Sequence, residues 1–232
     1  MNGFAAKEEL LSALEEARST GRFTQAAITD ADLSGVDFSG LDCSWWDFSN
    51  VILDGCDFSG SVLAHGKFPG CSFKNARLVN CDMEGVDFRG ADLTGADARG
   101  ANFFCAWMEQ ARLEGVIHDD ATRYFRMRCP ESGAFIGYKK CYEDRVVMLL
   151  IPADAKRVSA TNDACRCSKA KVLTITSFDF KERFSWANSL VDENFIYREG
   201  QWVTPDRFTE DRWVESTYGI HFWMTREDAI KY

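Results

Sequence analysis

Four polar side chains in the second half of the chain have the greatest capacity for chemistry. His221 could accept a proton, Glu215 could supply a carboxylate, and Arg166 or Lys140 could hold an anionic substrate. They qualify as catalytic candidates only if the fold gathers them in one cleft. The sequence contains no P-loop, dinucleotide-binding glycine motif, nucleophile elbow or zinc-protease motif. Catalysis is therefore an open alternative rather than the main expectation.

A cluster of basic residues offers a second kind of chemistry. Lys156, Arg157, Arg166, Lys169 and Lys171 fall within sixteen residues, and such a cluster could bind phosphate or another anion. The alternative is a solvated surface whose charges pair with nearby acids. Both interpretations stay open, and the five residues are predicted as a candidate anion-binding surface.

Four cysteines in the same region raise the question of a zinc site. They are Cys129, Cys141, Cys165 and Cys167. Zinc knuckles favour two residues between paired cysteines, whereas one residue separates Cys165 from Cys167, and their thiols are expected to point to opposite faces of a strand. We therefore predict buried thiols, no metal site and no cofactor. All nine cysteines of the chain are expected to be free, as in a reducing compartment.

The parts of the chain that would have to position these groups differ in charge. Residues 26–118 contain 14 acidic and 6 basic side chains, whereas residues 119–232 contain 18 of each. This acidic excess disfavours a conventional nucleic-acid surface in the middle segment. No apolar run approaches the length of a membrane span, and the N-terminus lacks a signal-peptide pattern. We expect a cytoplasmic protein with no membrane or direct nucleic-acid partner.

Residues 26–118 repeat with a period of five. Every fifth residue from Ile28 on is apolar, the residue two positions earlier is mostly small, Asp recurs between them, and Gly recurs two positions after the large residue. Neither a helix nor a strand has this period, but a coil with four sides does. Phe48, Phe68 and Phe88 should then stack in one interior column. Asp and Gly suit the turns between sides.

The pentads carry a specific resemblance. AlaAspLeuSerGly at 31–35 and ValAspPheArgGly at 86–90 resemble the pentapeptide-repeat family, whose pattern is A(D/N)LXX. The resemblance covers residues 26–117. It implies a mainly β fold, a right-handed quadrilateral β-helix that stacks as a rigid solenoid.

Some proteins of that family mimic DNA toward a topoisomerase, and this possibility can be weighed from the charges. Residues twenty apart share an outward column, and one such column runs Asp37, Asp57, Arg77, Asp97. A base interrupts the acids, so no side carries an unbroken ladder of negative charge. Asp at this position also serves the turn in every member of the family.

An N-terminal capping helix is predicted to occupy the first domain, residues 1–25. Its apolar stripe within residues 4–19 consists of Phe4, Leu10, Leu11 and Leu14, and Gly21 would end it. A helix of this kind would cover the open end of the first coil. Binding of a partner or of a second copy is the alternative.

A separate α+β domain is predicted for residues 119–232. We expect a hairpin of 134–142 with 145–151, further strands at 171–176, 195–198 and 219–225, a helical turn at 153–157, and a C-terminal helix capped by Thr225. The domain resembles a C-terminal domain of unknown function that follows pentapeptide repeats in bacterial and phage proteins. The resemblance brings no activity with it.

One segment of that domain has a second resemblance. GlyIleHisPhe at 219–222 is similar to a strand of ADP-ribosyltransferases that is followed by a helix beside the nicotinamide site. This resemblance is what gives His221 and Glu215 their place among the catalytic candidates. The histidine motif that such enzymes carry upstream has no match here.

These observations favour a non-catalytic interaction protein. A rigid repeat would present a C-terminal recognition domain to a protein partner, and the resemblance to phage proteins implies interference with host machinery. Two alternatives stay open: a DNA-mimicking modulator of gyrase, and an ADP-ribosyltransferase-like or nucleotide-processing enzyme. The identity of the partner and the oligomeric state do not follow from the sequence.

Overall fold

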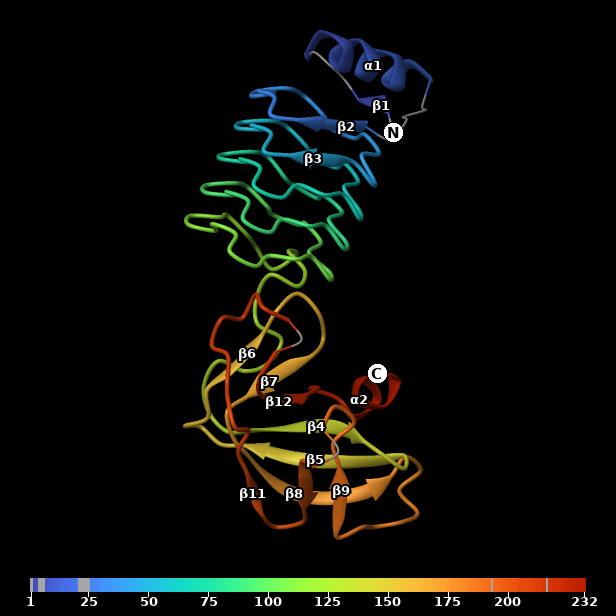
Figure 1. Ribbon diagram of the computed structural model, residues 1–232, viewed down its shortest axis with the longest axis vertical. Helices are drawn as coiled ribbons and strands as arrows, with labels where there is room; N and C mark the ends of the chain where they lie inside the picture. Colours follow the sequence, from blue (N-terminus) through green and yellow to red (C-terminus); the bar gives the residue numbers. More distant parts are fainter. Residues whose placement is uncertain (1, 4–6, 21–25, 193, 216) are drawn as a thin grey trace. The chain divides into compact units, whose positions relative to one another are not determined.

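The computed structural model describes residues 2–3, 7–20, 26–192, 194–215 and 217–232. The chain divides into two compact units, Met1–Arg126 and Met127–Tyr232 (Figure 1). The described residues are mainly β-structure, with α1 (Lys7–Thr20) in the first unit and α2 (Arg226–Lys231) in the second. Neither helix is long and apolar enough to cross a bilayer.

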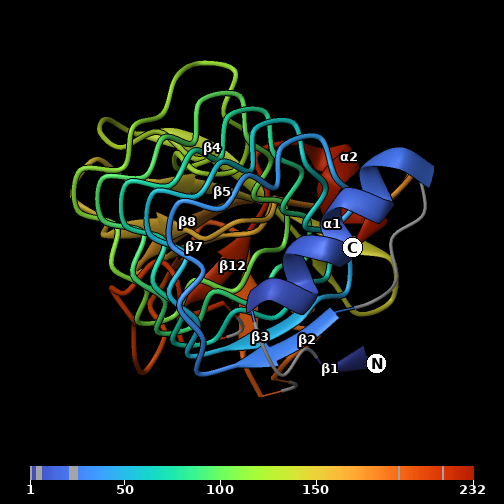
Figure 2. The ribbon, with the colours of Figure 1, turned by 90° about the horizontal axis from the view of Figure 1, so that it is seen from above.

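The first unit is a stack of twenty-residue coils. Strand β1 (Asn2–Gly3) pairs in parallel with β2 (Ala26–Thr29), and β2 pairs in parallel with β3 (Asp47–Ser49). From Asp32 to Ile117, parallel bridges join residues twenty apart, one bridge for each pentad. Seen from above, successive coils lie over one another (Figure 2). Each coil therefore satisfies its backbone through the coils above and below it.

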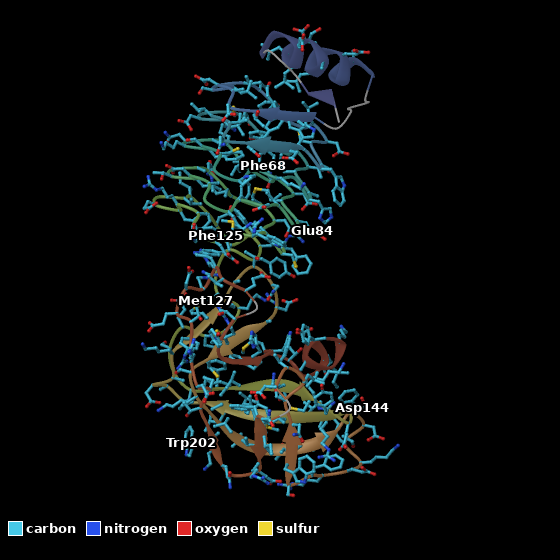
Figure 3. All side chains as sticks on the ribbon, viewed as in Figure 1. Phe68, Glu84, Phe125, Met127, Asp144 and Trp202 are labelled. Carbon is cyan, nitrogen blue, oxygen red and sulfur yellow. The ribbon has the colours of Figure 1, made fainter. Side chains whose placement is uncertain are left out.

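Large side chains fill the interior of this stack. Phe48, Phe68 and Phe88 are fully buried, and their ring centroids lie 5.7 and 5.9 Å apart in succession. Figure 3 labels Phe68 among the side chains that enter the stack. The predicted interior column is confirmed. Burial of these rings away from water is the main source of stability in this unit.

The turns between sides use the recurring Asp and Gly as the pattern predicts. The carboxylate of Asp37 accepts a hydrogen bond from the backbone N–H of Ser39 at 2.8 Å, and Asp57 accepts one from Ser59 at 2.9 Å. The last residue of each turn lies in the left-handed region, with φ of 68° at Gly90 and 59° at Gln110. Gly adopts this conformation without strain, whereas other residues do so at a cost.

This position makes a paired prediction about stability. Gly90→Ala is expected to lower the free energy of unfolding by about 1 kcal/mol, because a Cβ there meets no atom within 4 Å and the cost is purely conformational. Gln110→Gly is expected to raise the free energy of unfolding by about 0.5–1 kcal/mol. Denaturant titrations followed by circular dichroism measure both. Two changes of the same sign would contradict the explanation.

The two ends of the stack differ in part from the prediction. In α1, Leu10 and Leu14 are buried, but Leu11 is 37% exposed, so the predicted stripe is wrong at that residue. The predictions for Phe4 and Gly21 lie outside the described residues. At the other end, Asn102 pairs with Arg123. This bridge spans one residue more than the others. The first compact unit extends past residue 118, to Arg126.

The described residues of the second unit form three small sheets. One has the order β11-β8-β5-β4, formed by Trp202–Val203, Ala170–Ser177, Arg145–Ile151 and Phe135–Cys141. Another has the order β12-β7-β6, formed by Ile220–Phe222, Cys165–Cys167 and Arg157–Ser159. The third pairs β9 (Trp186–Asn188) with β10 (Ile196–Arg198). A shared apolar core lies between them, with Val147, Ile175 and Phe222 completely buried.

Most local predictions for this unit are confirmed. Strands β4 and β5 form the expected antiparallel hairpin. Thr225 caps α2, and its hydroxyl accepts a hydrogen bond from the N–H of Asp228 at 3.1 Å. The predicted helical turn at 153–157 is wrong: the chain makes a simple turn there, because Arg157 is already the first residue of β6.

Candidate functional site

A pocket of about 310 Å³ in the second unit brings the catalytic candidates together. Lys140 comes from β4, Arg166 from β7, His221 from β12 and Glu215 from the loop that precedes β12, and all four side chains line this pocket. The condition that they share one cleft is therefore met. What each group can do there depends on its own contacts.

Arg166 and His221 lie directly opposite each other on the paired strands β7 and β12. Cross-strand partners share a face of the sheet, so both side chains point into the pocket. The guanidinium of Arg166 donates to the carbonyl oxygens of Asp211 at 3.1 Å and Glu215 at 3.4 Å. Burial, followed by the charges of Lys139 and Arg166, lowers the pKa of His221 to about 4. His221 is consequently a neutral imidazole at pH 7.

The other two candidates are engaged in structural contacts. Lys140 donates from Nζ to the carbonyl oxygen of Ile230 at 3.1 Å, which stabilises the C-terminal end of α2. An oxygen of the Glu215 carboxylate accepts a hydrogen bond from the hydroxyl of Thr161 at 2.9 Å. The pocket therefore gathers the four residues without forming a free pair of acid and base.

Lys139 is a pocket residue that the sequence analysis missed. Alternate residues of β4 face the core, and this places Lys139 between the buried residues Gly137 and Cys141. Only 4% of Lys139 is exposed, and it lines the pocket. Burial lowers the pKa of its amine. The signal was available in the sequence, since the alternation of the strand assigns Lys139, not Lys140, to the core side.

The five basic residues predicted as an anion-binding surface do not form one. Arg157 faces the same side of its sheet as Cys167, whereas Arg166 faces the opposite side with Val158. Lys169 pairs with Asp154 at 2.6 Å. Lys156 forms an ion pair with Glu210. The guanidinium of Arg157 donates hydrogen bonds to four backbone carbonyl oxygens. Lys171 lies on β8, which belongs to another sheet. That prediction is wrong.

The cysteines of this unit are buried thiols. The expectation that Cys165 and Cys167 point to opposite faces is wrong, because alternate residues of a strand share a face, and both belong to the core. Among the described residues, no group of three or more His, Cys, Asp or Glu side chains could hold a metal ion. All nine cysteines of the chain are free thiols.

A second candidate site lies on the first unit. We call it the aromatic face, and it consists of Trp45, His65, Arg89 and Trp107 around an open depression of about 700 Å³. Trp45 is 58% exposed and Trp107 is 51% exposed. The rings of Trp45 and His65 lie 4.5 Å apart, and the guanidinium of Arg89 lies 4.6 Å from the centre of the Trp107 ring.

Trp45 also has an unusual backbone. Its φ of 63° puts it in the left-handed region, at the turn position that Gly occupies in most pentads. A bulky aromatic residue is strained in this conformation. The fold therefore holds an exposed tryptophan at a place where glycine would be more stable.

Several acidic side chains of the stack are paired with bases. Arg89 contacts Asp87 at 2.7 Å, and Arg99 contacts Asp97 at 2.6 Å. The hydrogen bond from Arg99 is the main cause that lowers the pKa of Asp97. These carboxylates also accept backbone hydrogen bonds in the turns, so they are not a free row of negative charge.

The repeating coils define the class of the protein. The family described as pentapeptide repeats (8 copies) matches this chain in overlapping stretches, at residues 22–55, 42–80, 56–95 and 81–117. Residues 22–117 are therefore pentapeptide repeats. Its second unit is more particular: residues 125–229 match the family of unknown function DUF5758. The protein thus carries pentapeptide repeats followed by a DUF5758 domain.

Solved structures of other repeat proteins are similar to part of the chain. Rfr23, a pentapeptide repeat protein from the cyanobacterium Cyanothece 51142, is 27% identical over 44% of this chain and 65% of its own, with a TM-score of 0.26. A pentapeptide repeat protein from the thylakoid lumen of Arabidopsis thaliana is 35% identical over 40% of this chain and 57% of its own, with a TM-score of 0.30.

A third similar structure is QnrB1, a plasmid-mediated fluoroquinolone resistance protein. It is 23% identical over 44% of this chain and 67% of its own, with a TM-score of 0.26. This chain spans less than two thirds of the length of the first two structures. No curated protein matches it.

Proposed function

We propose that the protein is a non-catalytic interaction protein, in which the repeat stack is a rigid support that binds a protein partner through its aromatic face. The observation that carries this proposal is Trp45, which is exposed and strained at once. The left-handed conformation costs about 1–2 kcal/mol for a residue other than glycine. Strain of this kind clusters at functional sites, where surrounding structure maintains it.

The chemistry of the aromatic face supports a protein as the partner. Tryptophan and arginine are the residue types that contribute most to protein–protein binding. Here Trp45, Arg89 and Trp107 are held on coils whose backbone is hydrogen-bonded to a neighbouring coil, so little entropy is lost on binding. Bases and acids alternate beside them, which suits neither nucleic acid nor a membrane surface.

In this proposal the coils form the right-handed quadrilateral β-helix that the repeat family implies. The presence of one parallel bridge per pentad supports a β-helix with one side per pentad. The DUF5758 domain is then the second recognition element on the same support. Nine free thiols favour the cytoplasm as its compartment. Host machinery is the first place to search for the partner.

Trp45→Gly tests the proposal without harming the fold, because glycine relieves the left-handed strain. A partner captured from bacterial lysate by the intact chain would be identified, purified and titrated against the variants. Trp45→Gly is expected to weaken binding about tenfold or more, which is the effect of losing a central aromatic contact. Gln110→Gly is the matched control, since it changes the same turn position and leaves the aromatic face intact. Equal affinity for Trp45→Gly and wild type would contradict the proposal.

An enzymatic role of the DUF5758 domain is a second candidate, favoured by one observation: His221, Glu215, Arg166 and Lys140 line a single pocket. The neutral imidazole of His221 could accept a proton. Release of nicotinamide from NAD by the intact chain, compared with His221→Gln, tests this candidate. Absence of turnover in the wild-type protein would remove it.

A further inference from the structure

The amine of Lys139 is the least expected group in the second unit. It lies on the core side of β4, where the alternate residues Gly137 and Cys141 are buried, and only 4% of Lys139 is exposed. A largely buried ammonium is costly unless a group of opposite charge or a hydrogen-bond acceptor stabilises it. Groups perturbed in this way are concentrated at functional sites.

The side chains around Lys139 do not neutralise it. The nearest ionisable groups on the core side are the thiols of Cys141 and Cys167, and burial raises the pKa of each to about 12. Both thiols are therefore neutral at pH 7. In the pocket of about 310 Å³, Glu215 is the one acidic side chain among the described lining residues, against the three cations Lys139, Lys140 and Arg166. The neighbouring pocket of about 490 Å³, which Lys139 also lines, adds Asp192, Asp206 and Arg207.

The space beside Lys139 suits a small organic molecule. Lys139 lines the pocket of about 310 Å³ and also a neighbouring pocket of about 490 Å³, and His221 borders both. Volumes of this size are typical of ligand sites. Part of the remaining wall is apolar: Leu190 and Val191 contribute aliphatic surface, and the Trp223 ring lies 4.5 Å from that of Tyr232. Asn162 and Thr217 add polar groups to it.

We propose that this pocket binds a small organic anion with a flat apolar body, whose acidic group is held by Lys139 beside His221. The acidic group adds negative charge to a pocket whose cations outnumber its acids, and the body of the ligand lies against the apolar part of the wall. Lys140 and Arg166 add positive potential while keeping their backbone contacts. This inference is independent of the aromatic face, which belongs to the other unit.

Isothermal titration calorimetry with the intact chain tests the proposal. The probes are phenyl phosphate and benzoate, which separate phosphate from carboxylate recognition, with benzyl alcohol as the neutral ring and inorganic phosphate as the bare anion. One aromatic anion is expected to bind at least about tenfold more tightly than either control probe. Equal binding of benzyl alcohol, or no binding of either aromatic anion up to about 10 mM, would overturn the proposal.

Variants assign the effect to Lys139. Lys139→Met keeps the length of the side chain, suits the apolar core, and is expected to weaken anion binding about tenfold or more. Lys171→Met is the matched control, because Lys171 is a partly buried strand lysine outside the pocket, and it should bind like wild type. Unchanged affinity in Lys139→Met would overturn the assignment.

A measurement on the wild-type protein provides a second test that needs no variant. Because burial lowers the pKa of Lys139 below its ordinary value of 10.5, anion affinity should begin to fall at a pH below 10.5 as the amine loses its proton. An affinity that stays constant up to pH 10.5 would contradict the role of Lys139.

Discussion

Phe68→Ala is expected to lower the free energy of unfolding of the repeat unit by about 3–5 kcal/mol, the usual cost of removing a buried aromatic ring. Phe68 is completely buried, and its ring centroid lies 5.7 Å from that of Phe48, 5.4 Å from Phe73 and 5.9 Å from Phe88. The backbone on each side is bridged to neighbouring coils, so the stack cannot collapse into the cavity. The loss should therefore lie near the upper end of the range.

A urea titration followed by far-ultraviolet circular dichroism measures this loss. The matched control is Lys67→Ala, one residue away, because the Lys67 side chain is 62% exposed and its ion pair with Asp47 is a surface pair. Such pairs contribute about 0–1 kcal/mol. A Phe68→Ala loss no greater than that of the control would mean that the interior column does not stabilise the unit.

The coils were predictable because one rule repeats in every pentad. A period of five assigns Phe48, Phe68 and Phe88 to the same interior column before any coordinate is known, and chance cannot reproduce that register so many times. Sequence-based prediction of the coils fails where the five-residue period ends. The bridge from Asn102 to Arg123 breaks the spacing of twenty, so the pattern alone could not carry the first unit beyond residue 118.

The second unit was less predictable because its strands are short and its contacts are distant in sequence. Arg157 and Arg166 are close in the sequence, yet they face opposite sides of one sheet, and this separates the predicted basic cluster. The pocket was partly predictable: His221 and Arg166 were expected to share a cleft. Lys139 was missed because two adjacent lysines look equivalent until the alternation of β4 is applied.

The pairing of acids bears on the alternative of DNA mimicry. A mimic needs carboxylates that are free to face a partner. In this stack Asp87 and Asp97 each bind an arginine and a turn N–H, and Lys67 lies between Asp47 and Asp87 in their outward column. The same side chains that build the turns thus lose much of their negative potential. The aromatic face is a better basis for recognition than the charge of the stack.

Acidification from pH 6.5 to pH 4 is expected to destabilise the second unit by about 2–3 kcal/mol through His221 alone. Its pKa is about 4 in the folded protein, against an ordinary value of 6.5, so the unfolded chain binds the proton more readily in this window. The contribution of His221 to stability is therefore complete above pH 6.5 and is lost as the pH falls toward 4. The cause is burial, reinforced by the positive charges of Lys139 from β4 and Arg166 from β7.

The variant His221→Gln isolates this effect, because glutamine keeps a polar side chain and does not titrate. Protonation of carboxylates also destabilises the protein in acid. The comparison therefore uses, for each protein, the change in the unfolding free energy of the second unit between pH 6.5 and pH 4. Wild type should lose about 2–3 kcal/mol more than His221→Gln. His65→Gln, at an exposed histidine of the other unit, should behave like wild type. If His221→Gln lost as much stability in acid as wild type, neither burial nor the positive charges of Lys139 and Arg166 would be lowering the pKa of His221.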